Sequence, residues 1–109
     1  DGQSVAEVDG KIYKGQDPQR LIFRLTGHQL PINQMPDWLL GKVEKQVTNA
    51  TFDENDRISS FQYINNTQTW MINYVSWESI PPLSLPKTLN LTSSKNRVKV
   101  SVSSWNFQG

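Results

Sequence analysis

The hydrophobic positions follow two different periods along the chain. Between Asp17 and Gly41 they recur at the spacing of a helix face, and from Val47 onward they alternate with polar positions as in strands. Ahead of the helical part, the dipeptide Asp9-Gly10 is typical of a tight two-residue hairpin turn. The pattern therefore predicts two short strands within residues 1–16, two helices within 17–41 and about five antiparallel strands within 47–107.

The first predicted helix begins at Asp17-Pro18. A carboxylate can cap the first turn, and a proline costs nothing where the N–H has no helical partner. Leu21, Ile22 and Leu25 share one face of this helix. Gly27 suits the left-handed conformation that follows a last helical turn, so the helix is expected to end there.

A second, short helix is predicted from Asn33 to Leu40. Asn33 is the expected cap, Gly41 closes the helix, and Pro36 falls in the first turn, where it is tolerated. Its apolar face carries Met35, Trp38 and Leu39.

Two hairpins are predicted in the strand-like part. The first joins Ile58–Ile64 to Thr69–Ser76, runs rich in aromatic and β-branched residues. The second joins Thr88–Thr92 to Arg97–Phe107, where apolar and polar residues alternate cleanly. One face of this sheet is therefore expected to be apolar and the other to meet water.

Turn residues and prolines separate these strands. Asp9-Gly10 lies between the strand-like runs Ser4–Val8 and Lys11–Lys14. Because proline cannot donate a ladder hydrogen bond, three prolines are expected to break the chain between the two later hairpins. They are Pro81, Pro82 and Pro86.

Composition narrows the class of protein. A chain of 109 residues is expected to form a single small domain, and four Trp residues argue against disorder. A net charge of +1 gives no strong field for nucleic acid or anionic lipid. The first residue is Asp1 rather than Met, so a processed or excised piece is expected. The absence of Cys excludes disulfides, thiolate metal sites and cysteine nucleophiles.

Catalysis has little support in the sequence. The single histidine, His28, follows Gly27 and is interpreted as a solvated loop residue. Asp53–Arg57 resembles a calcium loop, but Arg57 stands at a ligand position and the turn glycine is missing, so a polar turn is expected. With no nucleophile elbow and no phosphate-binding loop either, we expect no enzyme, no cofactor and no metal site.

The tryptophans leave three interpretations open. They can fill the core, line an apolar cavity together with the helix faces, or form a stacking platform for sugars. The four are Trp38, Trp70, Trp77 and Trp105. Periodicity alone does not choose among these interpretations.

Several motifs in register resemble the LolB family of Gram-negative outer-membrane lipoprotein receptors. They are Leu25–Ile32, Asp37–Gly41, Gln68–Trp70 with Tyr74, Leu85-Pro86 with Leu89–Thr92, and Arg97–Val100 with Trp105. The resemblance runs from about Val5 to Phe107, in the family's order and spacing. One departure follows Gly41, where this chain reads Lys42-Val43-Glu44 and the family commonly continues Leu-Pro-Gly.

The resemblance implies an α+β fold that is mainly antiparallel β: an open half-barrel with two short helices on its concave side. In this family a receptor at the periplasmic face of the outer membrane takes lipoproteins from the periplasmic carrier LolA and delivers them to the inner leaflet. The acyl chains enter an apolar cavity. This chain resembles only the C-terminal portion, without the family's lipidated cysteine or its membrane-insertion loop.

Residue-by-residue matching gives eight candidates for the cavity lining, each with ordinary core packing as the alternative. They are Leu21, Ile22, Leu25, Trp38, Leu39, Trp70, Tyr74 and Trp105. A partial sheet exposes an unpaired edge, so two copies are expected to associate as a homodimer. The alternative function is a carbohydrate-binding β-module that uses tryptophan platforms.

Overall fold

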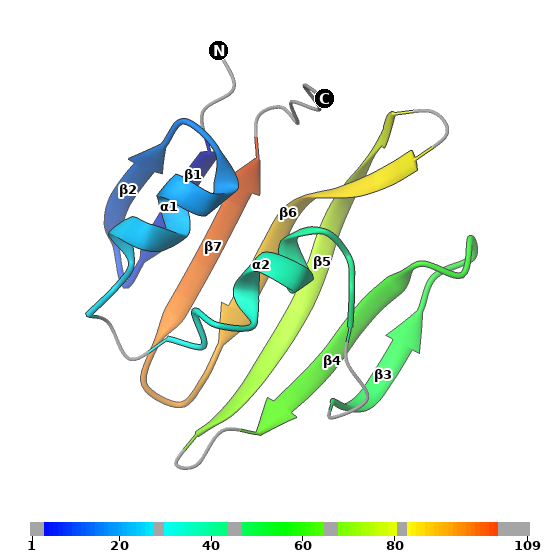
Figure 1. Ribbon diagram of the computed structural model, residues 1–109. Coiled ribbons are helices and arrows are strands. Elements are labelled where there is room, and N and C mark those ends of the chain that lie inside the picture. Colours follow the sequence, from blue (N-terminus) through cyan, green and yellow to red (C-terminus); the bar gives the residue numbers. More distant parts are fainter. Residues whose placement is uncertain (1–3, 28–29, 44–46, 65–67, 81–82, 103–109) are drawn as a thin grey trace.

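The computed structural model describes residues 4–27, 30–43, 47–64, 68–80 and 83–102. These residues form two strands, then two helices, then five more strands (Figure 1). Their bounds are β1 Ser4–Val8, β2 Lys11–Gly15, α1 Pro18–Arg24, α2 Met35–Leu39, β3 Thr48–Phe52, β4 Ile58–Ile64, β5 Thr69–Ile80, β6 Leu83–Thr92 and β7 Arg97–Val102. Within the described ranges, no helix is long and apolar enough to span a bilayer.

The strands form one antiparallel sheet in the order β2-β1-β7-β6-β5-β4-β3. Every neighbouring pair is antiparallel, and the sheet does not close, since β2 and β3 lie at its two edges. Both helices pack against the same face (Figure 1). The expected fold class, an open antiparallel half-barrel with two short helices on one side, is confirmed.

The first strand of the described chain, β1, lies between β2 and β7, next to one edge of the sheet. β1 pairs with β2 through the Asp9-Gly10 turn, where both residues have positive φ, as a tight hairpin turn requires. On its other side β1 pairs with β7, with Ser4 opposite Val102. The sheet therefore joins the two ends of the described chain.

Side-chain alternation places the core on the helix-facing side, here called the inner face. In β7 the buried residues Val98, Val100 and Val102 alternate with Arg97, Lys99 and Ser101, which lie on the opposite, outer face. This confirms the predicted alternation of that strand, described as far as Val102. The predicted continuation to Phe107 lies outside the described residues.

Several boundaries differ from the sequence prediction, and the first helix ends at Arg24 rather than beside Gly27. The second helix begins at Met35 with Gln34 as its cap residue, so Asn33 is not the cap, and the Gln34 side chain makes no capping hydrogen bond. β5 continues to Ile80 and β6 begins at Leu83. Both strands are therefore longer than predicted and pair over most of their length.

The prediction that Pro86 breaks the chain is wrong. Pro86 lies inside β6, opposite Trp77, where the register between β5 and β6 shifts. A proline is tolerated where the ladder is irregular, because no regular hydrogen bond is lost there. Pro81 and Pro82 lie outside the described residues.

Candidate functional site

The inner face and the two helices enclose one continuous layer of apolar side chains. From the helices and their connection come Leu21, Ile22, Leu25, Leu30, Met35, Trp38 and Leu39. From the sheet come Ala6, Val8, Ile58, Phe61, Trp70, Ile72, Tyr74, Leu89, Leu91, Val98 and Val100. All of them are buried, so this layer is the core of the described structure.

The character of this layer changes across the sheet. Beneath α1, on β1 and β7, its members are small and aliphatic, such as Ala6 and Val100. On β4 and β5 three large aromatic residues, Phe61, Trp70 and Tyr74, stand beside two isoleucines. Aliphatic surface accepts a hydrocarbon chain with little geometric demand, whereas aromatic rings impose preferred contact geometries.

Helix α1 sits directly on the backbone of β2. A Cβ atom added at Gly15 would lie 2.5 Å from the backbone nitrogen of Leu21, closer than real atoms approach. Only glycine allows this contact. The helix is also capped locally, because the Asp17 carboxylate accepts a hydrogen bond of 2.8 Å from the Arg20 backbone N–H. The predicted start of this helix is confirmed.

Helix α2 is held through Trp38. The Tyr74 hydroxyl donates a buried hydrogen bond of 2.6 Å to the Trp38 carbonyl oxygen. The Trp38 ring makes edge contacts with Phe61 and Tyr63, each with centroids 5.2 Å apart. Burial raises the pKa of Tyr74 well above its ordinary value of 10.0, so its hydroxyl stays protonated and able to donate.

The aromatic cluster continues to the surface at Trp77. Its ring stacks on Tyr74, with centroids 5.3 Å apart, and the Arg57 guanidinium lies 5.4 Å from its centre. Arg57 also pairs with Asp53 at 3.0 Å. Just after α2, Gly41 has a φ of +78°, and a Cβ there would approach the Trp77 ring to 2.9 Å. Gly41 therefore lets the chain leave the helix against this ring.

Two buried polar groups, one within the apolar layer and one beside it, have no hydrogen-bond partner among the described residues. The indole N–H of Trp70 and the hydroxyl of Ser4 are buried without a hydrogen bond in the described structure. An unpaired donor in a core costs about 1–3 kcal/mol. The apolar layer is therefore less stable than its side chains alone would allow.

The structure brings seven of the eight predicted lining residues together. Leu21, Ile22, Leu25, Trp38, Leu39, Trp70 and Tyr74 all belong to the buried layer. Trp105, the eighth, lies outside the described residues. Their burial is compatible with both core packing and cavity lining, so their role as a lining stays a prediction.

Sequence reasoning missed several members of the same layer. Phe61 is fully buried, and Tyr63 is partly buried against the apolar layer, yet neither was a candidate. The signal was available, because these two aromatic residues occupy alternate positions of a predicted strand and so face the same side. Leu89, Leu91 and Val100 carry the same alternation signal in their hairpin.

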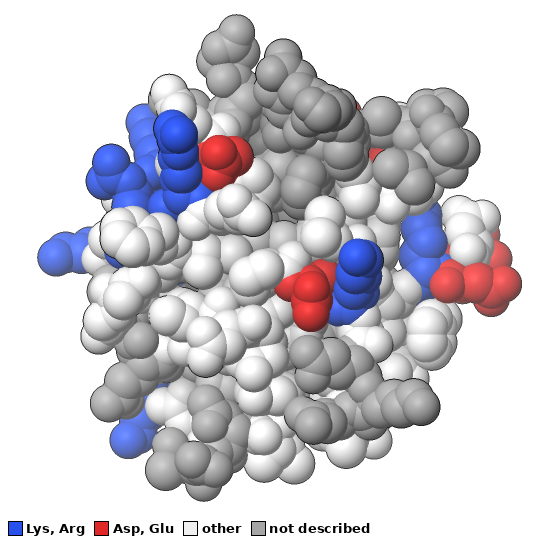
Figure 2. Space-filling model, viewed as in Figure 1, with Lys and Arg blue, Asp and Glu red and all other residues white. Residues whose placement is uncertain are grey.

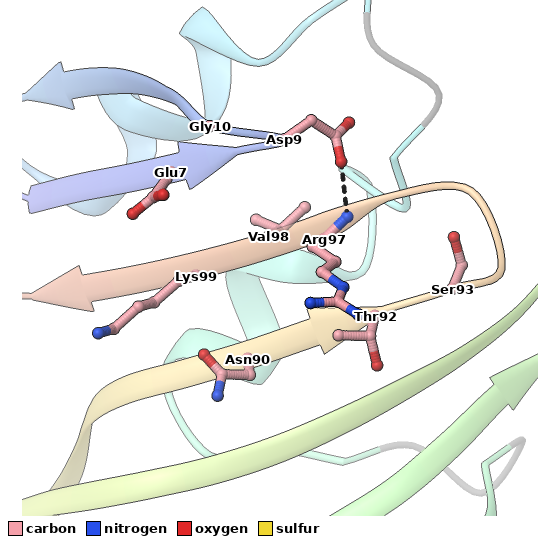
Figure 3. Close-up of a pocket in the computed structure, with 9 residues that line it drawn as sticks. All are labelled: Glu7, Asp9, Gly10, Asn90, Thr92, Ser93, Arg97, Val98 and Lys99. Atoms are coloured by element: carbon pink, nitrogen blue, oxygen red, sulfur yellow. Dashed lines mark hydrogen bonds between the residues drawn. The ribbon is translucent and has the colours of Figure 1, made fainter.

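The outer face carries a shallow polar depression of about 650 Å³ over β1, β7 and β6 (Figure 3). Glu7, Lys99 and Asn90 extend from it on neighbouring strands. At its end, the Asp9 carboxylate accepts hydrogen bonds from the Arg97 backbone N–H at 2.8 Å and from the Asn96 amide at 2.7 Å. Those bonds fasten the β1–β2 turn to the β6–β7 turn, which is a structural role.

The segment Asp53–Arg57, whose sequence resembles a calcium loop, forms a turn, as predicted. The Asp53 carboxylate accepts hydrogen bonds from the backbone N–H groups of Asn55 and Arg57, at 2.8 and 3.0 Å, and so closes the connection between β3 and β4. Among the described residues, no group of three or more His, Asp or Glu side chains could hold a metal ion. His28 lies outside the described residues.

The carbohydrate alternative does not agree with the structure. Trp38 and Trp70 are 1% and 0% exposed, and the Trp77 ring is in contact with Tyr74 and Arg57. A sugar platform needs an aromatic ring with an open face. None of the three described tryptophans provides one, so this interpretation of the tryptophans is corrected: two are core residues and one is half-buried.

Comparison with known proteins gives one consistent result. Residues 1–105 match the family model described as outer membrane lipoprotein LolB. The chain is 31% identical over 105 residues to the outer-membrane lipoprotein LolB of Shewanella sediminis, covering 96% of this chain and 48% of that protein. It is 32% identical over 108 residues to that of Vibrio cholerae, covering 95% and 52%. It is 33% identical over 107 residues to that of Pectobacterium carotovorum, covering 96% of this chain and 50% of that protein.

Proposed function

The chain belongs to the LolB family of outer-membrane lipoproteins, and from that premise we propose that it binds lipoprotein acyl chains between its helices and the inner face of its sheet. The chain spans about half the length of the curated relatives it matches. The activity of the whole protein is therefore part of this proposal: reception of lipoproteins from the carrier LolA and their delivery at the periplasmic side of the outer membrane.

One observation carries the proposal: seven predicted lining residues gather in a single buried apolar layer under two very short helices. Helices of seven and five residues have little stability of their own, so packing on the sheet holds them in place. An acyl chain that displaces part of this packing gains equivalent apolar contacts with the inner face. The exchange replaces one apolar surface with another.

The energetics suit transfer without a nucleotide. Each CH₂ group moved from water into an apolar site contributes about 0.8 kcal/mol, so an acyl chain binds strongly without polar chemistry. Passage from carrier to receptor requires only that the receptor binds more tightly, and a tenfold preference corresponds to about 1.4 kcal/mol. The role is one of binding and release, with no catalytic step.

Brominated fatty acids test this site directly, because bromine quenches nearby tryptophan emission. We expect quenching that is reduced in Trp38→Phe and Trp70→Phe, whose rings lie in the buried layer. Trp77→Phe is the matched control, because Trp77 stands at the surface end of the aromatic cluster. Quenching lost only in the control, or binding of a soluble glycan panel in place of fatty acids, would contradict the proposal.

Self-association is a separate part of the proposal. All five residues of the edge strand β3 are exposed, and an unpaired edge favours pairing with another strand. We propose that two copies associate through this edge or by exchanging elements. Light scattering at tens of micromolar protein should then give the mass of a dimer, and a monomer at that concentration would refute the pairing.

A further inference from the structure

The face of α1 that points away from the sheet has an unusual combination of side chains. Phe23 is 77% exposed, the highest value among the exposed large hydrophobic residues described. It shares a shallow groove of about 530 Å³ with Gln19, Arg20 and Arg24. The opposite face of the helix already supplies Leu21 and Ile22 to the core, so folding does not account for Phe23.

Positive charge surrounds this phenylalanine. Besides Arg20 and Arg24, the edge strand beneath the helix contributes Lys11, which lies opposite Val8 and so on the helix-bearing face, and all three basic side chains are exposed. The nearby carboxylate is Asp17, which faces Arg20 at 3.8 Å across an exposed pair. Figure 2 shows Lys and Arg side chains gathered over this corner of the molecule, at the upper left. We call these residues, with Phe23, the α1 corner.

A second exposed phenylalanine provides the contrast within the same chain. Phe52, at the end of β3, is 62% exposed and is followed by Asp53, Glu54 and Asp56. These two phenylalanines are similarly exposed, but one lies in a basic setting and the other in an acidic one. The contrast lets the role of charge be tested separately from that of exposed aromatic surface.

We propose that the α1 corner binds an anionic lipid surface. Phe23 enters the boundary between headgroups and acyl chains, where aromatic rings are favoured, while the basic side chains contact lipid phosphates. Arginine suits this contact because its planar guanidinium donates two parallel hydrogen bonds to a phosphate. An acidic protein partner would require the charge alone and would leave the exposed ring without a role.

This inference extends the proposed function without depending on the acyl site, because no residue of the buried layer takes part. It would bring the helix-bearing side of the sheet against the membrane (Figure 1). In that orientation, the helices that cover the proposed acyl site face the bilayer that receives the cargo.

Vesicle flotation tests the proposal with the 109-residue chain and no lipoprotein. We expect binding to phosphatidylcholine vesicles that contain phosphatidylglycerol, and much weaker binding to phosphatidylcholine alone. The double variant Arg20→Glu with Arg24→Glu should weaken binding by well over tenfold, since each removed cation alone accounts for about fivefold. Lys87→Glu with Lys95→Glu changes the net charge equally at exposed positions elsewhere and should have a much smaller effect.

The phenylalanines form the second pair of variants. Phe23→Ser should weaken vesicle binding several-fold, while Phe52→Ser should leave it unchanged. Equal losses in both double charge variants, or binding that does not depend on phosphatidylglycerol, would overturn the proposal. The proposal would also be overturned if the chain did not bind vesicles but self-associated, and if the Arg20 and Arg24 changes abolished that self-association. The α1 corner would then dock on the acidic β3–β4 turn of a second copy. Failure of fatty-acid quenching would leave this result untouched.

Discussion

The two helices cover the same sheet, but they are held there by different means. Helix α1 has a side-chain cap from Asp17 and an aliphatic face seated on Gly15. Helix α2 has no side-chain cap and depends on Trp38, whose carbonyl and ring both bind aromatic residues of the sheet. One helix is specified by its own residues, and the other by contacts with strands that come later in the chain.

This difference suggests how the layer over the inner face can open. Aliphatic contacts beneath α1 are non-directional, so under the proposed function an acyl chain would replace them without a geometric penalty. The contacts of α2 combine a buried hydrogen bond with oriented ring contacts, and these are lost together when the helix moves. We therefore expect α2 to be the fixed part of the cover and α1 the part that yields.

The largest expected effect comes from removing the anchor of α2. Trp38→Ala should lower the free energy of unfolding by about 3–5 kcal/mol, because it deletes a fully buried ring and its edge contacts. Urea denaturation measures the change. Phe23→Ala, at an exposed aromatic position, should change stability by less than about 0.5 kcal/mol. A loss below 1 kcal/mol for Trp38→Ala would refute the assigned role.

The second largest effect is expected at Gly15, where α1 contacts the backbone of β2. Gly15→Ala should cost about 1–3 kcal/mol, because the added methyl group meets the backbone of Leu21, which cannot turn aside as a side chain could. Thermal unfolding measures this loss, and the exposed neighbour Lys14→Ala is the control. If Gly15→Ala were neutral, α1 would be seated more loosely than the structure indicates.

The buried hydrogen bond to α2 is tested by Tyr74→Phe. The change removes one of the donors to the Trp38 carbonyl oxygen, which keeps the Gly41 N–H at 2.9 Å, and should cost about 1–1.5 kcal/mol near neutral pH. Burial raises the pKa of Tyr74 in the folded state, so above about pH 10 only the unfolded chain releases this proton. Stability should therefore fall as the pH rises past 10, and less steeply in the variant. Identical alkaline slopes would contradict this.

The local cap of α1 gives the smallest expected effect. Asp17→Ala removes the acceptor for the Arg20 N–H and should cost about 1 kcal/mol. Asp17→Asn preserves an acceptor and should retain most of the stability, whereas Asp37→Ala in α2, which has no side-chain cap, serves as a control. Equal losses at the two helices would remove the distinction drawn between them.

The features that could be predicted from sequence are those decided by neighbouring residues. The Asp9-Gly10 hairpin, the Asp17-Pro18 helix start and the alternation of β7 all follow from local chemistry, and the structure has them. The start of α2 does not follow from local chemistry, because contacts with Tyr74 and Phe61 fix that helix. The place of Pro86 depends on a register shift between two strands, which a single strand does not encode.

The residues of the candidate site also differ in whether local sequence could place them. The residues Leu21, Ile22 and Leu25 could be placed on one helix face by their spacing alone. The face taken by Trp70 in β5 could not be predicted, because a strand that slips by one residue turns every side chain to the other side of the sheet. Pairing of Tyr63 with Trp70 and of Tyr74 with Leu89 sets that register.

The pairing of β1 with β7 has a consequence for the order in which the protein folds. The bond between the Asn96 amide and Asp9 joins positions 87 residues apart, so the β1–β2 hairpin is connected to the rest of the described sheet only when β7 is present. Contacts this distant in sequence slow folding. During synthesis, the β1–β2 hairpin would therefore remain outside the sheet until β7 has emerged. With Ser4 beside Val102, a circular permutant that links these ends and opens at an exposed turn should remove that delay.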